Sequence, residues 1–227
     1  ALVTLAFACR RSTGPDERVT SPRIQALRRV AEDMAKEPAP AMAPFPPERV
    51  AAWREALEAA GATTVDLRGL WPDVLEPDAA SVAVSDTPLM RSARKCDARS
   101  VRAWLALGAD AASYADSRGM RALDVALSCD DRGLFATANE IVQACGPACV
   151  AFDEEKRPHD GLGPVHRVLT RWASSFFATR PNPNPWNQLL GVLLTAGEGW
   201  GRRFLLEPTA TPARETPLHI ACAKRNV

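Results

Sequence analysis

Apolar residues recur at intervals of three or four along most of the chain, which is the spacing of one face of an α-helix. Two such helices are expected near the start, at 21–37 and 47–62. Ser21 is typical of a residue that caps a helix start, and Gly61 of a residue that ends one. The pattern predicts an all-α protein.

A unit of two short helices recurs from residue 86 onward. Residues 86–127 read as Thr-Pro-Leu, a short helix, a second helix, Gly-Ala-Asp and a polar turn, after which the order starts again. Measured from the first motif position, units begin near 87, 121, 163 and 216. The later units are longer, so we expect loop insertions in them.

Each motif residue has a physical role. Thr87 is expected to cap the first helix and Pro88 to occupy its first turn, where the missing amide hydrogen is not needed. Leu89 faces inward, Gly108 ends the second helix, and Gly119 shapes the turn to the next unit. The residues that carry the pattern are Thr87, Pro88, Leu89, Gly108, Ala109, Asp110, Gly119, Pro164, His166, Gly197, Thr216, Pro217, Leu218 and His219.

This pattern resembles the ankyrin repeat, a unit of about 33 residues with a T-P-L-H-x-A signature. The resemblance is clearest at 86–127 and 216–222. It implies an α-solenoid of degenerate repeats. It also implies that His166 and His219, at the fourth signature position, make hydrogen bonds between repeats.

The resemblance further implies a protein-binding face, formed by the loop tips and the first helix of each unit. The side chains expected to be exposed on that face are Met90, Arg91, Arg94, Lys95, Tyr114, Asp124, Ser128, Arg167, Arg171 and Lys224. The expected function is therefore non-catalytic protein–protein interaction, with another protein as the partner.

Three domains are expected: a segment at 1–20, an N-terminal helical cap or degenerate repeat with a Pro-rich connector at 21–85, and the repeats at 86–227. Because the last unit stops after its first helix, we expect the chain to be part of a longer array. Two alternative functions remain open: a structural module of an exported envelope protein, and the targeting part of a larger enzyme.

The charged residues and the histidines give no sign of other chemistry. With 28 basic and 27 acidic residues the net charge is +1, so nothing favours nucleic acid as a partner. The spacing around His159 fits no zinc pattern, and neither G-x-S-x-G nor H-E-x-x-H occurs. We expect no catalysis, no cofactor and no metal.

The cysteines leave the compartment open. The apolar start ending at Cys9 resembles the tail of a secretory signal or a lipoprotein cleavage site, although a truncated helix or strand would look the same. A cytoplasmic location is favoured; in the exported alternative, lipidation of Cys9 would supply the only membrane attachment. In that alternative Cys145 could pair with Cys149 or Cys129, whereas in a reducing cytosol these cysteines are small core residues.

Overall fold

The computed structural model describes residues 21–37, 43–62, 86–116, 118–128, 131–151, 160–175, 185–196, 204–206, 208–209 and 214–223. Every regular element within these ranges is helical, which confirms the all-α class. The predictions for residues 1–20, Cys129, His159, Gly197 and Lys224 lie outside the described residues.

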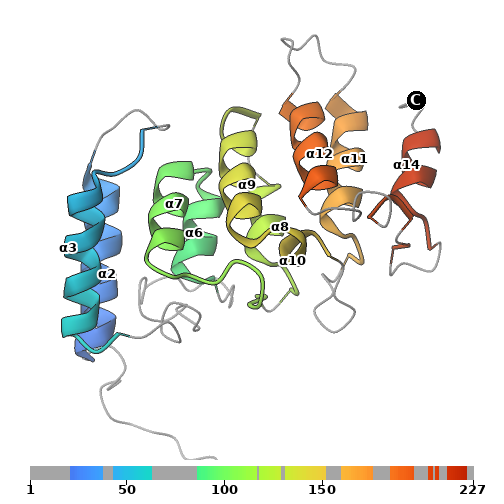
Figure 1. Cartoon of the computed structure of the whole chain (residues 1–227). Helices are drawn as coiled ribbons and strands as arrows, with labels where there is room; N and C mark the ends of the chain where they lie inside the picture. Colours follow the sequence, from blue (N-terminus) through green and yellow to red (C-terminus); the bar gives the residue numbers. More distant parts are fainter. Residues whose placement is uncertain are drawn as a thin grey trace, which may run out of the picture.

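The helices follow one another with short connections wherever both neighbours are described. They are α2 (Pro22–Lys36), α3 (Pro47–Ala59), α6 (Pro88–Arg94), α7 (Ala98–Ala106), α8 (Ala122–Ala126), α9 (Asp131–Cys145), α10 (Pro147–Val150), α11 (Pro164–Ser175), α12 (Pro185–Thr195) and α14 (Pro217–Ala223) (Figure 1).

Consecutive helices pack as pairs, and the pairs stand in a row. Helix α2 packs on α3, α6 on α7, α8 on α9 and α11 on α12. The first helices α6, α8, α11 and α14 contact one another in that order, and so do the second helices α7, α9 and α12. Figure 1 shows the resulting line of pairs running from α2 and α3 at one end to α14 at the other.

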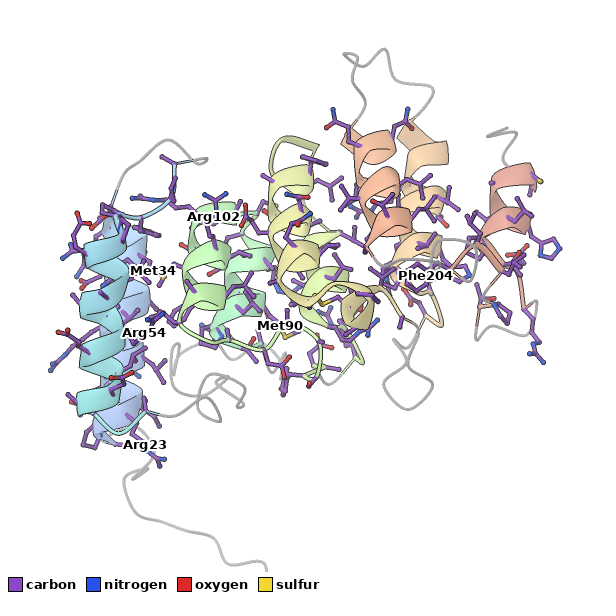
Figure 2. All side chains as sticks on the ribbon, viewed as in Figure 1. Arg23, Met34, Arg54, Met90, Arg102 and Phe204 are labelled. Carbon is purple, nitrogen blue, oxygen red and sulfur yellow. A yellow bond between two sulfur atoms is a disulfide. The ribbon has the colours of Figure 1, made fainter. Side chains whose placement is uncertain are left out.

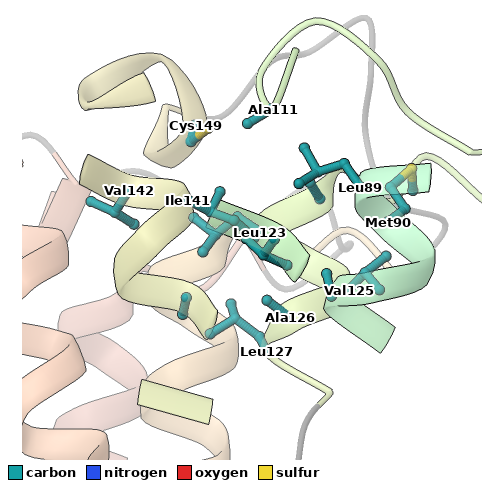
Figure 3. Packing of buried hydrophobic residues seen from close by; sticks show 14 of the residues in the cluster. Leu89, Met90, Ala111, Leu123, Val125, Ala126, Leu127, Ile141, Val142 and Cys149 are labelled. Carbon is teal, nitrogen blue, oxygen red and sulfur yellow. The ribbon is translucent and has the colours of Figure 1, made fainter. Parts of the chain in front are cut away.

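The apolar faces of the pairs meet between the two rows. Leu89 of α6, Leu123 of α8 and Ile141 of α9 are all completely buried and lie together in Figure 3. Leu189 and Leu193 continue the core into α12. Helices as short as α6 and α8 are marginal in isolation, so their stability comes from this packing.

The motif residues at the start and end of the first repeat unit behave as predicted. The Thr87 hydroxyl accepts a hydrogen bond from the Met90 amide at 3.2 Å, and Pro88 begins α6. Gly108 has a φ of 97° where α7 ends, a conformation that favours glycine. The prediction for Ser21 was wrong: it precedes α2 but makes no capping hydrogen bond with its side chain.

Polar contacts join the N-terminal pair to α7. The Arg99 guanidinium lies 3.5 Å from the centre of the Phe45 ring and 3.3 Å from the Glu37 carboxylate. Arg54 of α3 donates to the Ala106 carbonyl at 2.7 Å. Arginines therefore contribute to the junction between α2–α3 and the next pair, beside the buried apolar side chains there.

Candidate protein-binding surface

Two of the residues expected on the partner-binding face are buried. Met90 and Asp124 each expose only 1% of their surface, so the prediction of their exposure was wrong. Helix α6 packs against both α7 and α8, and Met90, labelled in Figure 2, joins the hydrophobic core. Asp124 is enclosed by arginines from its own turn and from α11.

The other predicted face residues reach solvent to different extents. Lys95, Arg94 and Ser128 are exposed, and so is Arg171 on α11. Arg91, Tyr114 and Arg167 are partly buried. The accessible part of the face therefore consists mainly of basic side chains on α6 and α11.

Arg94 is held in one orientation by Asp86. Its Nε and Nη2 donate to the two carboxylate oxygens of Asp86 at 2.7 and 2.8 Å. The hydrogen bond to Asp86 raises the pKa of Arg94. Arg94 thus ties α6 to the residues before it, and its role is partly structural.

Asp124 forms the centre of a buried ion-pair network. Its carboxylate accepts the backbone amide of Arg121 at 3.1 Å and the Arg167 Nε at 3.2 Å, and the Arg121 Nε lies 3.8 Å away. Arg167 also donates to Asp160 at 2.7 Å. Burial raises the pKa of Asp124, while the two arginines oppose that shift. The network joins α8 to α11.

Arg171 makes a second link between these helices. Its guanidinium donates to the Leu127 carbonyl at 2.8 Å. Leu127 follows the last residue of α8, where carbonyl groups have no partner within the helix. The rest of the Arg171 side chain remains on the exposed face.

The fourth motif position has a local role in two units. His219 Nδ1 lies 3.2 Å from the Thr216 amide, and the Thr216 hydroxyl accepts the His219 amide at 3.3 Å. Asp124 accepts the Arg121 amide in the same way. His219 is exposed, and its hydrogen bonds lie within its own turn. This differs from the expected hydrogen bond between repeats. His166, at the same motif position, is buried.

Leu218 also differs from its counterpart in the first unit. It is 49% exposed, whereas Leu89 is fully buried. Among the described helices α14 packs chiefly on α11. The signature sequence alone therefore does not decide whether the leucine is buried.

The loop tip after α7 is fixed by two aspartates. The Asp110 carboxylate accepts the amides of Ala112 and Ser113 at 2.8 and 3.0 Å. Asp116 accepts the Met120 amide at 2.8 Å, and Gly119 has a φ of 75°. The role predicted for Gly119 in the turn is confirmed. Tyr114 is presented between these two turns.

Two grooves flank the junction between the α2–α3 pair and the α6–α7 pair. The α2–α6 groove has a volume of about 220 Å³ and is lined by Arg28, Ala31, Glu32, Met34, Ala35, Pro88, Arg91, Ser92, Lys95, Asp97, Ser100 and Trp104. The α3–α7 groove has a volume of about 330 Å³ and is lined by Pro44, Phe45, Pro47, Val50, Ala51, Arg54, Arg99, Arg102, Ala103 and Ala106.

Sequence reasoning missed both grooves because they depend on how the α2–α3 pair meets the α6–α7 pair. Phe45 lies in a Pro-rich stretch predicted only as a connector, yet it is 5% exposed and stacks under Arg99. An aromatic residue inside that stretch was the available signal.

The structure pairs Cys145 with one of the two cysteines that the sequence left open as its partner. Cys145, the last residue of α9, forms a disulfide with Cys149 in α10, with their Cα atoms 5.7 Å apart. Of the other described cysteines, Cys96 and Cys222 are free thiols. The link closes α10 onto the end of α9.

Within the described ranges, no three His, Cys, Asp or Glu side chains are grouped as metal ligands would be. None of the described helices has the length and apolarity needed to cross a membrane. No known family model matches this chain, and comparison with curated proteins gives no significant match.

Proposed function

We propose that this chain is a non-catalytic protein-binding module, built as an α-solenoid of degenerate ankyrin-like repeats. The observation that carries the proposal is the order of contacts, in which first helices touch first helices and second helices touch second helices. Repeat proteins stack in this way and use the extended surface along the stack to bind partners.

The local geometry of the repeat starts supports the same proposal. Thr87 and Thr216, which occupy the same motif position, both accept an amide hydrogen bond from the residue three positions later. Pro88 and Pro217 each begin the helix that follows. Two segments more than 120 residues apart thus form the same turn.

The proposed binding face runs over α6, the loop tip at Tyr114 and α11. Its accessible side chains include Lys95 and Arg171, and Tyr114 supplies an aromatic group of the kind enriched at interfaces. Arg94 pairs with the Asp86 carboxylate, and Arg121 and Arg167 pair with that of Asp124. These ion pairs order the face before binding.

The proposal is tested by recovering a partner from the source cells with the immobilised chain and purifying it. Alanine at Lys95, Tyr114 or Arg171 is expected to weaken binding by about 1 kcal/mol or more in at least one variant. Alanine at Gln143 and Asn187, exposed on the second helices α9 and α12, provides the matched control. Losses confined to the control variants, measured by calorimetry on folded proteins, would contradict the chosen face.

A second candidate is favoured by the disulfide. Disulfides persist mainly in oxidising compartments, so the Cys145–Cys149 link supports an exported protein that uses the stack as a structural module. In that case mass spectrometry of the protein taken directly from its cells finds the pair oxidised. A fully reduced pair in the native protein counts against export.

A further inference from the structure

The α2–α6 groove combines an apolar floor with a basic rim. Resting on the proposed protein-binding function, we propose that this groove binds an acidic segment of a partner protein and takes up one of its bulky apolar side chains. The groove lies on the side of the row formed by the first helices, because Pro88 and Arg91 of α6 and Lys95 directly after it line the groove.

The floor is suited to a single apolar anchor. Met34, Pro88 and Trp104 are all buried and line the groove from three different helices. Its volume of about 220 Å³ lies below the roughly 300–1,000 Å³ typical of sites for whole small molecules. One large side chain fills such a space, as anchor residues do at protein interfaces.

The basic groups on the rim come from both sides of the groove. Arg28 lies on α2, and Arg91 and Lys95 lie on or directly after α6. Lys95 is exposed, and within the described part of the chain no ion pair involves it. A segment lying along the groove would therefore pass between cations on either side.

The two acidic groups at the groove only partly offset this charge. The Asp97 carboxylate accepts the Ser100 amide at 3.1 Å and the Ser100 hydroxyl at 2.6 Å, so it serves as the cap of α7. Glu32 lies 3.9 Å from Lys36 on its own helix. The three basic side chains that line the groove outnumber the two acidic ones, which favours an acidic ligand.

All three arginines that line the α3–α7 groove are held by other groups of the chain. Arg54 donates to Ala106, Arg99 lies over Phe45, and Arg102 pairs with Glu140 of α9. The exposed Lys95, which takes part in no ion pair among the described residues, distinguishes the α2–α6 groove as the one that receives an acidic partner.

The experiment selects binders for the immobilised full chain from a phage library of random twelve-residue peptides. Enriched peptides are expected to carry several Asp or Glu residues around a Leu, Phe or Trp. The double variant Arg91→Glu/Lys95→Glu should weaken the binding of a selected synthetic peptide about tenfold or more, because the new carboxylates repel its acidic residues. Ala35→Trp, which fills the groove from an exposed lining position, should do the same.

The matched control is Arg29→Glu, because Arg29 is an exposed residue of α2 that does not line the groove. It should leave the peptide affinity within about twofold, since salt screens a single exposed charge that lies outside the groove. Circular dichroism checks that each variant is folded.

Three results overturn the inference: enrichment of neutral or basic peptides, affinity unchanged by the groove variants, or no enrichment at all. If Arg171→Glu weakens the binding of the selected peptides and the groove variants do not, the peptides bind elsewhere. That result would contradict the assignment of the site to the groove and leave the proposed function intact. Failure of the proposed function itself appears separately, as loss of partner binding only in the Gln143 and Asn187 variants.

Discussion

Single side chains in this protein are often engaged where the sequence suggests that they are available. Asp124 occupies a position expected to face a partner, yet its carboxylate is buried between Arg121 and Arg167. A buried carboxylate is retained only with compensating partners, and these come from its own turn and from 43 residues further along the chain. A hydrophobicity pattern cannot reveal such a distant partner.

Asp124 gives a prediction for the pH dependence of stability. Burial raises its pKa in the folded state above the ordinary value of 3.8. Its contribution to stability is thus fully present below pH 3.8 and is lost as the pH rises through the folded pKa. The free energy of unfolding of the wild type, minus that of Asp124→Asn, should therefore fall as the pH rises across this range.

Asp124→Ala controls this measurement, because it also lacks the titrating carboxyl group. The free energy of unfolding of the wild type minus that of Asp124→Ala should change with pH by the same slope as the difference from Asp124→Asn. This holds even if the two variants differ from each other in stability. Denaturant unfolding at a series of pH values provides the numbers. A rising difference would mean that Arg121 and Arg167 lower the pKa of Asp124 more than burial raises it.

At the scale of the elements, the sequence predicted the helices well and their contacts poorly. The apolar spacing located α2 and α3, and the Thr-Pro start and glycine end located α6 and α7. These features are local, since caps and periodicity act within a few residues. Met90 was misplaced because its burial depends on two neighbouring helices rather than on its own.

A close approach between elements gives a second prediction. Gly133 of α9 lies against the turn between α6 and α7, where an added Cβ would come within 2.5 Å of the Cys96 Cβ and 2.8 Å of its carbonyl oxygen. Backbone atoms cannot move aside easily, so Gly133→Ala should destabilise the protein by about 1–3 kcal/mol.

Gly191→Ala is the matched control, because Gly191 lies in the middle of α12 with no atom within 4 Å of an added Cβ. There the better helix propensity of alanine should stabilise the protein by up to about 1 kcal/mol. Thermal or denaturant unfolding compares the two variants. Equal effects at both positions would contradict the packing of α9 against the α6–α7 turn.

At the scale of the whole molecule, the row of pairs means that each pair contacts mainly its neighbours. The sequence did not predict the arginine-rich junction at which the α2–α3 pair joins the row. That junction rests on Phe45, Arg99 and Arg54, which belong to no repeat motif. The sequence could not predict the α2–α6 groove beside it either, because the groove forms only where the α2–α3 pair meets the next pair.

The central claim, that the molecule is a stack held together by contacts between neighbours, is tested most directly by hydrogen exchange in the variant Ile220→Asn. Ile220 is buried in α14, which packs chiefly on α11 among the described helices. In a stack the amides of α14 and α11 should lose protection while those of α6 and α7 keep it. A uniform loss of protection across all helices would show one cooperative unit and contradict the account.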